Sequence, residues 1–186
     1  YQLIKKATSN NILALMCDST NVFSKHSGRS ESLLNENFDD LFLNSRGLVV
    51  ATTFASNLAR LKTIAVAAKN NGREICVLGR AMNSMLKAAQ SVGILKEFPD
   101  LISPKEAKKI PRERLLILAT GSQGEDRAAS AQLSYSGYMN FTLGEGDTFV
   151  FSSKTIPGNE VSVTAIVNRF VERGVEVIYE DNDKFH

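Results

Sequence analysis

Asp18, Ser19, Thr20 and Asn21 form a group of polar side chains that could take part in chemistry. They directly follow a short apolar run over residues 12–17, which is typical of a buried strand. In α/β proteins the carboxyl ends of buried strands carry the active site, so Asp18 is a candidate catalytic residue. The alternative is an ordinary turn, because these side chain types also hydrogen-bond to their own backbone.

Polar and basic residues follow other apolar runs in the same way. These candidates for substrate binding are Ser56, Asn57, Arg60, Arg80, Ser122, Gln123 and Lys154. Helix N-termini present free backbone N–H groups, hydroxyl groups add donors, and arginine and lysine add positive charge. Together they indicate a cleft that binds phosphate or a nucleotide backbone. Helix capping alone is the alternative for each junction, since Ser and Asn are favoured N-caps.

The expected elements would bring these residues to one edge of a sheet. Apolar runs predict strands over residues 12–17, 48–52, 74–78, 115–119, 148–151 and 175–179. Helical patterns lie over residues 31–43, 57–70, 82–92, 125–135 and 160–173, and a capping box at Ser103 begins a further short helix. Several runs are apolar on consecutive residues, which favours strands covered on both faces. We therefore expect an α/β fold: a doubly wound, mostly parallel sheet of about six strands with helices on both faces.

Composition limits the classes of function. The 186 residues carry a net charge of +2, so a nucleic-acid site would have to be a local patch. No apolar run is long enough to span a membrane, and Cys17 and Cys76 lie in apolar runs, which favours a reducing, cytoplasmic setting. The two histidines, His26 and His186, form no His-x-His or His-x-x-x-His pair, so the chain alone cannot build a histidine-rich metal site. The glycine motifs of dinucleotide-binding and P-loop proteins are absent from the sequence.

Several short motifs occur in a fixed order along the chain. They are DSTN at 18–21, Ser30-Glu31, FASNLAR at 54–60, GRAM at 79–82, TGSQGE at 120–125 and FSSKTIPGNE at 151–160. In this order and spacing they resemble the β-CASP domain of bacterial ribonuclease J, in the metallo-β-lactamase superfamily. The resemblance covers about residues 10–186. It implies that residues 1–20 are the trailing strand of a metallo-β-lactamase domain that leads into a β-CASP domain over 21–186, and that the chain is a piece of a longer protein.

The resemblance also implies a function. Ribonuclease J enzymes hydrolyse RNA phosphodiesters as 5′-to-3′ exonucleases and as endonucleases, and they prefer single-stranded RNA with a 5′-monophosphate. Two Zn²⁺ ions in the metallo-β-lactamase domain, bound by residues outside this chain, activate the attacking water, and the β-CASP domain clamps the RNA. The implied partners are RNA and the protein's own metallo-β-lactamase domain, with homo-oligomers as a further expectation and no membrane. The chain alone is expected to be inactive because it lacks the metal motif.

Residue roles carry over only where this sequence matches the motifs. Asp18 matches a carboxylate that supports an active-site histidine, which would lie just beyond His186. His186 matches the first histidine of a His-x-Ser-Gly-His motif and would grip the scissile phosphate. Ala81 stands where the family usually has serine, which removes a hydroxyl group. Asp126 stands where the family usually has proline, which adds negative charge near the cleft.

Other classes of function are compatible with the sequence. A stand-alone nucleotide-binding or RNA-binding α/β module without catalysis would bind mononucleotides tightly on its own. A structural or interaction module would accompany an upstream domain that has lost its metal ligands. Within the superfamily, a DNA-directed or 3′-end-processing nuclease is a further alternative, and the TGSQGE and IPGNE motifs favour the ribonuclease J branch.

Overall fold

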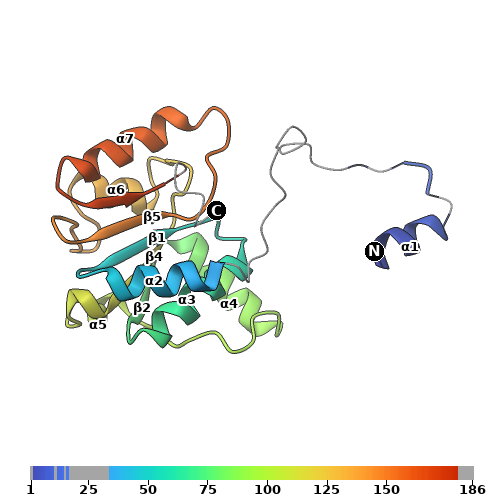
Figure 1. Cartoon of the computed structure of the whole chain (residues 1–186), viewed down its shortest axis with the longest axis horizontal. Coiled ribbons are helices and arrows are strands. Elements are labelled where there is room, and N and C mark those ends of the chain that lie inside the picture. The colour runs from blue at the N-terminus through green and yellow to red at the C-terminus, as the bar shows by residue number, and fades with distance from the viewer. Residues whose placement is uncertain (1, 11, 15, 17–33, 180–186) are drawn as a thin grey trace.

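A parallel six-stranded sheet forms the centre of the computed structural model, which describes residues 2–10, 12–14, 16 and 34–179 (Figure 1). The strands are β1 (Val49–Thr52), β2 (Glu74–Leu78), β3 (Leu101–Ile102), β4 (Leu115–Ala119), β5 (Thr148–Phe151) and β6 (Glu176–Ile178). Their order across the sheet is β3-β2-β4-β1-β5-β6, and each neighbouring pair is parallel. The predicted α/β fold is therefore confirmed.

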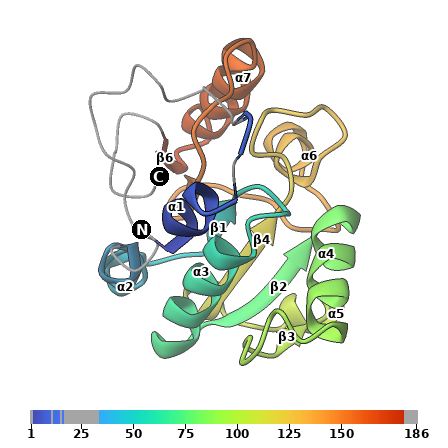
Figure 2. The same cartoon turned by 90° about the vertical axis from the view of Figure 1, so that its right-hand side faces the viewer.

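Helices cover both faces of this sheet (Figures 1 and 2). They are α2 (Asn35–Asn44), α3 (Leu58–Asn70), α4 (Arg80–Ser91), α5 (Pro104–Ala107), α6 (Ala129–Tyr135) and α7 (Glu160–Val171), and α1 (Gln2–Thr8) precedes them in the chain. Helices α2, α3 and α4 share one hydrophobic core with the sheet. Helices α6 and α7, with Ala107 of α5, share the core on the opposite face. The sheet is therefore doubly wound, as predicted.

Alternation along each strand explains why the apolar runs are continuous. Val49 and Ala51 of β1 face the core under α2, α3 and α4, whereas Val50 faces the core under α6 and α7. All three side chains are at most 1% exposed. A strand buried on both faces needs an apolar residue at every position, and parallel sheets have this property because crossover helices cover both sides.

Local signals in the sequence set the ends of several helices. Asn57 caps α3, where its Oδ1 accepts a hydrogen bond from the backbone N–H of Arg60 at 3.1 Å. The capping box of α5 is confirmed: the Glu106 N–H donates to Ser103 Oγ at 3.3 Å, and the Ser103 N–H donates to Glu106 Oε2 at 2.9 Å. The hydrogen bonds from Ser103 hold the pKa of the Glu106 carboxyl below its usual value.

Two predicted elements differ from the structure, and one strand was not predicted. The expected strand over residues 12–17 is wrong for its described part, because residues 12–14 and 16 have no regular structure and no described strand pairs with them. A strand needs a neighbour to complete its backbone hydrogen bonds. Strand β3 was not predicted, since its two residues give no pattern. The helix expected over 125–135 begins only at Ala129, because residues 125–128 form a turn in which the Ala128 N–H donates to Glu125 O.

Candidate functional site

The carboxyl ends of β1, β2 and β4 meet where the chain reverses direction across the sheet. Strand β4 lies between β2 and β1. The helices that follow β1 and β2 cover one face, and the helix that follows β4 covers the other. Open parallel sheets bind ligands in the crevice at such a reversal. Here the loops that follow the adjacent strands β2 and β4 diverge toward opposite faces and leave space between them. The loops after these strands carry most of the predicted substrate-binding residues.

Hydrogen bonds tie the ends of neighbouring strands together at this edge. Thr52 Oγ1 donates to Ala119 O at 2.9 Å, which joins β1 to β4. Thr53 Oγ1 donates to Ser152 O at 3.0 Å, which joins the loop after β1 to the loop after β5. Both threonine side chains are buried. The predicted residues therefore stand on a rigid frame of strand ends, not on independent loops.

Arg60 contacts the loop after β5 from inside the protein. The arginine is only 7% exposed, and its Nη1 donates to both the carbonyl oxygen and the Oγ of Ser152 at 2.8 Å. The structure therefore gives Arg60 a role in joining α3 to β5. Both hydrogen bonds use Nη1 of the guanidinium group. The predicted contact of Arg60 with phosphate stays a prediction.

Gln123 has a similar joining role. Its side-chain Nε2 donates to Lys154 O at 3.0 Å, and its Oε1 accepts from the Ile156 N–H at 2.7 Å and from Asn159 Nδ2 at 3.2 Å. The residue is 7% exposed. The amide of Gln123 thus holds the loop that carries Lys154. This arrangement favours a positioning role over the predicted direct contact with substrate.

The other predicted residues differ in exposure. Ser56, Arg80 and Lys154 are exposed at the carboxyl edge, where they can meet a ligand, and Asn57 is half-buried as the cap of α3. Ser122 is buried at 3% exposure. Asp18 and His186, the residues with predicted catalytic and phosphate-binding roles, lie outside the described residues.

Ser153 presents a polar atom that the fold leaves unsatisfied. Its Oγ is buried and has no hydrogen-bond partner within the described part of the chain. An unsatisfied buried hydroxyl costs about 1–3 kcal/mol, and such groups are found where a site awaits a ligand or another polar group. Ser153 is the second residue after β5, so it belongs to the same edge as the predicted site.

A pocket of about 510 Å³ opens between the ends of β2 and β4. Its lining residues are Gly79, Arg80, Ala81, Thr120, Arg127, Ala129, Gln132 and Tyr138. Both arginines are exposed, and the lining contains no carboxylate. Of this set, the sequence analysis had singled out only Arg80 as a binding residue and Ala81 as a departure. Arg127 lies two residues after TGSQGE, so reading further into the loop after β4 would have included it.

Close packing shapes the wall of this pocket. Gly79 has a φ of +121°, and a Cβ atom there would lie 2.3 Å from Thr120 Oγ1. Glycine is therefore required where the end of β2 passes the end of β4. This contact places Arg80 and Thr120, on different strands' loops, at the same pocket.

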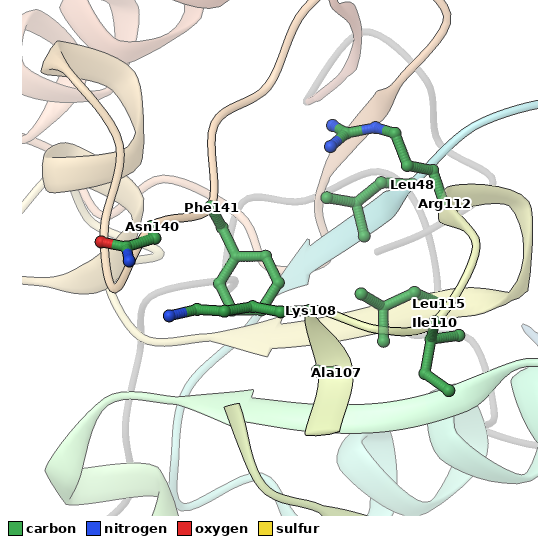
Figure 3. Close-up of a pocket in the computed structure, with 8 residues that line it drawn as sticks. All are labelled: Leu48, Ala107, Lys108, Ile110, Arg112, Leu115, Asn140 and Phe141. Atoms are coloured by element: carbon green, nitrogen blue, oxygen red, sulfur yellow. The ribbon is translucent and has the colours of Figure 1, made fainter. Parts of the chain in front are cut away.

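The opposite edge of the sheet has a different character. A pocket of about 280 Å³ lies there, lined by apolar side chains that include Leu48, Ile110 and Phe141 and by exposed Lys108 (Figure 3). Arg112 reaches this pocket, but its guanidinium is paired with Asp147. This lining therefore has one exposed lysine beside a paired arginine, whereas two exposed arginines line the larger pocket at the carboxyl edge, which favours that edge as the candidate site.

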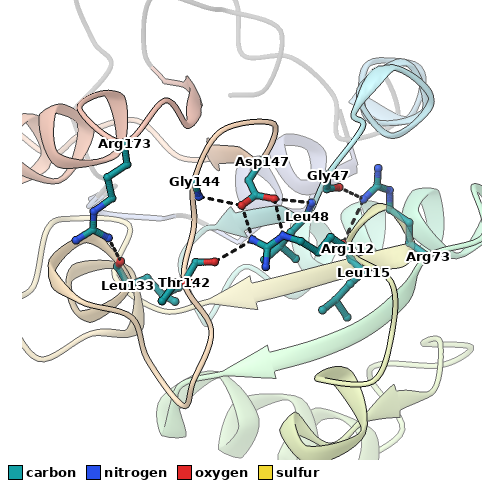
Figure 4. Close-up of polar contacts among 10 residues, drawn as sticks. All are labelled: Gly47, Leu48, Arg73, Arg112, Leu115, Leu133, Thr142, Gly144, Asp147 and Arg173. Carbon is teal, nitrogen blue, oxygen red and sulfur yellow. Dashed lines mark hydrogen bonds and ion pairs between the residues drawn. The ribbon is translucent and has the colours of Figure 1, made fainter.

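Buried polar contacts close this amino edge (Figure 4). Asp147, at 3% exposure, accepts from the Leu48 N–H at 2.9 Å, from the Gly144 N–H at 3.0 Å and from Arg112 through Nε at 3.1 Å and through Nη2. Arg73 is 1% exposed and donates to four carbonyl oxygens, including Gly47 O at 2.9 Å. Burial lowers the pKa of the Arg73 guanidinium. The contacts of Asp147 and Arg73 therefore join neighbouring segments of the fold at this edge.

The part of the chain that the structure describes contains no group of three or more His, Cys, Asp or Glu side chains arranged to hold a metal ion. Within the same residues, no helix has the length and apolar character needed to cross a membrane.

Comparison with known proteins agrees with the motifs. The family described as "Ribonuclease J, beta-CASP domain" matches residues 46–170. The chain is 37% identical over 175 residues to "Ribonuclease J" of Sinorhizobium meliloti, and this match covers 94% of the chain and 31% of that relative. It is 33% identical to "Ribonuclease J" of Thermus thermophilus over 98% of this chain and 32% of the relative, and 33% identical to "Ribonuclease J2" of Bacillus subtilis over 95% and 32%. The chain spans about a third of the length of these relatives.

Proposed function

Because this chain belongs to the β-CASP domain family of ribonuclease J, we propose that it is the RNA-binding domain of a ribonuclease. The observation that carries the proposal is the positively charged pocket at the carboxyl edge, where the sheet reverses direction. Exposed Arg80 and Arg127 line this pocket, and exposed Lys154 and Ser56 follow β5 and β1 at the same edge of the sheet. Phosphate groups of single-stranded RNA are the ligand that this chemistry suits best.

The proposed reaction is hydrolysis of RNA phosphodiesters, as a 5′-to-3′ exonuclease and as an endonuclease, with a preference for a 5′-monophosphate. Two Zn²⁺ ions, which would activate water for attack, would be bound by residues outside this chain. Asp18 would accept a hydrogen bond from a histidine beyond His186 and hold its tautomer and orientation. His186 would donate to the scissile phosphate. A cytoplasmic location and homo-oligomers belong to the same proposal.

The domain's own contribution is to bind and orient the strand. Phosphates would lie along the loops after β1, β2, β4 and β5, whose ends are joined by the hydrogen bonds of Thr52 and Thr53. A joined edge changes little on binding, so less of the interaction free energy is lost in ordering the site. Gln123 would hold the loop of Lys154 in place for this contact.

The test compares the intact protein with the present chain. We expect the intact protein to hydrolyse 5′-monophosphorylated single-stranded RNA and the chain alone to bind it weakly, with an affinity that falls as salt rises, but not to cut it. Asp18→Ala should abolish hydrolysis by the intact protein, whereas Asp126→Ala, which removes an exposed carboxylate near the same edge, should leave it largely unchanged.

Two results would contradict the proposal. Hydrolysis by the purified chain that Asp18→Ala abolishes would show that the chain needs no partner domain. Tight binding of mononucleotides by the chain, without any hydrolysis by the intact protein, would instead establish a stand-alone binding module.

A further inference from the structure

We propose that the pocket between β2 and β4 is a subsite that holds one nucleotide of the RNA strand away from the reacting phosphate. Arg80 and Arg127 would bind the phosphate of this nucleotide, and the ring of Tyr138 would stack on its base. The inference rests on the proposed RNA-binding function. It adds a specific place on the domain, a specific ligand unit and two residues, Arg127 and Tyr138, that the motifs did not indicate.

The size of the pocket suits a nucleotide. Its volume of about 510 Å³ exceeds the 280 Å³ and 240 Å³ of the two pockets at the amino edge. Sites for small ligands fall in a range of about 300–1,000 Å³. The pocket therefore has room for a sugar, a base and a phosphate together, whereas the other two are below this range.

The charge of the pocket selects an anion. Arg80 and Arg127 come from loops after different strands, and both are exposed side chains that line the same pocket. The neighbouring Glu125 does not line the pocket, and its Oε2 accepts a hydrogen bond from the Gln123 N–H at 3.0 Å. Two guanidinium groups can bind the oxygens of one phosphate, and arginine is well matched to this geometry.

The backbone that carries each arginine is fixed by a side chain. Asn83 Nδ2 donates to Gly79 O at 3.0 Å, directly before Arg80. Gln132 Nε2 donates to the carbonyl oxygen of Arg127 at 3.0 Å. A site on fixed backbone positions binds with a smaller entropic cost than one on free loops.

Tyr138 provides an aromatic wall. It is half-buried, packs against the core under α6 and α7, and pairs with Phe141 through two backbone hydrogen bonds of 2.9 Å. Bases of single-stranded RNA are recognised largely by stacking on aromatic side chains held in this way. The lining residues include no histidine, carboxylate or thiol, so the pocket is suited to holding RNA and not to cleaving it.

The test measures binding of single-stranded RNA by the full-length protein at several salt concentrations. We expect Arg127→Ala to weaken binding about tenfold and to reduce the slope of log K against log salt by about 0.7, as for the loss of one phosphate contact. Arg46→Ala is the control, because it removes the same charge from an exposed position at the amino edge. It should leave the slope unchanged. In turnover, Arg127→Ala should raise KM and leave kcat nearly the same.

Tyr138 gives a second, independent measurement. Tyr138→Phe keeps the ring and should bind RNA as the unchanged protein does, whereas Tyr138→Ala should weaken binding between about 5-fold and 100-fold.

Equal effects of Arg127→Ala and Arg46→Ala on a protein that binds RNA in a salt-dependent way would overturn the subsite and leave the proposed function intact. Absence of salt-dependent RNA binding by the unchanged protein would overturn the proposed function itself. Binding of free AMP or UMP as tight as that of RNA, and equally sensitive to Arg127→Ala, would assign the pocket to a mononucleotide and refute the RNA subsite.

Discussion

Gln123 shows how a single buried side chain can hold a loop of the candidate site in place. Its amide makes three hydrogen bonds to residues 154–159, through both Nε2 and Oε1. Because the side chain is buried, each lost bond would leave a backbone or amide group unsatisfied. The loop of Lys154 therefore depends on Gln123 for its position.

Gln123→Ala should lower the free energy of unfolding by about 2–4 kcal/mol, because three partly buried hydrogen bonds are lost. Gln132→Ala is the matched control, since the half-buried Gln132 makes one hydrogen bond, to Arg127 O, and should cost less than about 1.5 kcal/mol. Urea denaturation of the two variants measures the difference. Equal losses of unfolding free energy in the two variants would mean that the three hydrogen bonds of Gln123 contribute no more to stability than the single side-chain bond of Gln132.

Cys76 predicts a dependence of stability on pH. Burial raises the pKa of this thiol from 9.0 to about 11, so the folded protein binds more protons than the unfolded chain between these values. The contribution of the thiol is complete below pH 9 and is lost as pH rises through 11, by about 2–3 kcal/mol in total. Cys76→Ala removes this term, so the stability difference between the unchanged protein and Cys76→Ala should shrink across this range. A difference independent of pH would contradict the prediction.

At the scale of elements, Gly124 sets the approach of the loop after β4 to helix α7. Its φ is +77°, and a Cβ atom at this position would lie 2.6 Å from Ser162 Cβ and 2.9 Å from the Val163 backbone nitrogen. Helix α7 must therefore pack directly against the glycine. This contact fixes the distance between α7 and the loop that carries Ser122 and Gln123.

Gly124→Ala should cost clearly more than the backbone strain of its φ alone. Gly72 is the control, because its φ of +73° is nearly the same and no atom lies within 4 Å of its missing Cβ. We expect Gly72→Ala to cost about 1–2 kcal/mol, and Gly124→Ala to cost a further 1–3 kcal/mol because α7 must shift. Thermal denaturation compares the two. A loss no larger for Gly124→Ala than for Gly72→Ala would show that α7 is free to move.

Elements were predictable from the sequence where their pattern was long. Continuous apolar runs predicted β1, β2, β4 and β5, because a strand covered on both faces is largely apolar. The run over residues 175–179 also predicted β6, although this edge strand is exposed to half-buried. Strand β3 has two residues and owes its existence to pairing with β2, which no local pattern reveals. The apolar run at 12–17 looked like a strand, but Leu13 and Met16 are fully or almost fully exposed, so apolar character alone did not establish a sheet partner.

The candidate site was predictable only in its location. Strand ends pointed to one edge of the sheet, since parallel strands end together, and the structure places the pocket with two exposed arginines at that edge. The roles of single residues depended on tertiary packing. Arginine is almost always exposed unless paired, so nothing in the sequence predicted that Arg60 would be buried against Ser152. Arg127 lines the pocket because the turn after Gly124 places it near the end of β2, and this arrangement depends on tertiary structure.

At the scale of the whole molecule, the two edges of the sheet have separate tasks. The carboxyl edge carries exposed positive charge and the large pocket. The amino edge is closed by Asp147, which connects β1, the segment before β4 and the turn before β5 through side-chain contacts, and β6 through its carbonyl oxygen (Figure 4). Substitutions at the amino edge should therefore lower stability without changing the salt dependence of RNA binding.

Asp147→Ala should lower the free energy of unfolding by about 3–5 kcal/mol, because it removes a buried carboxylate that accepts from Arg112 and two backbone N–H groups. Glu74→Gln is the control, since the ion pair between Lys69 and Glu74 at 3.0 Å is partly exposed and should contribute less than 1 kcal/mol. Below the unfolding transition, Asp147→Ala should bind RNA with an unchanged salt slope, because the carboxyl edge keeps all its cations. A changed slope in a folded Asp147→Ala protein would show instead that the amino edge takes part in binding RNA.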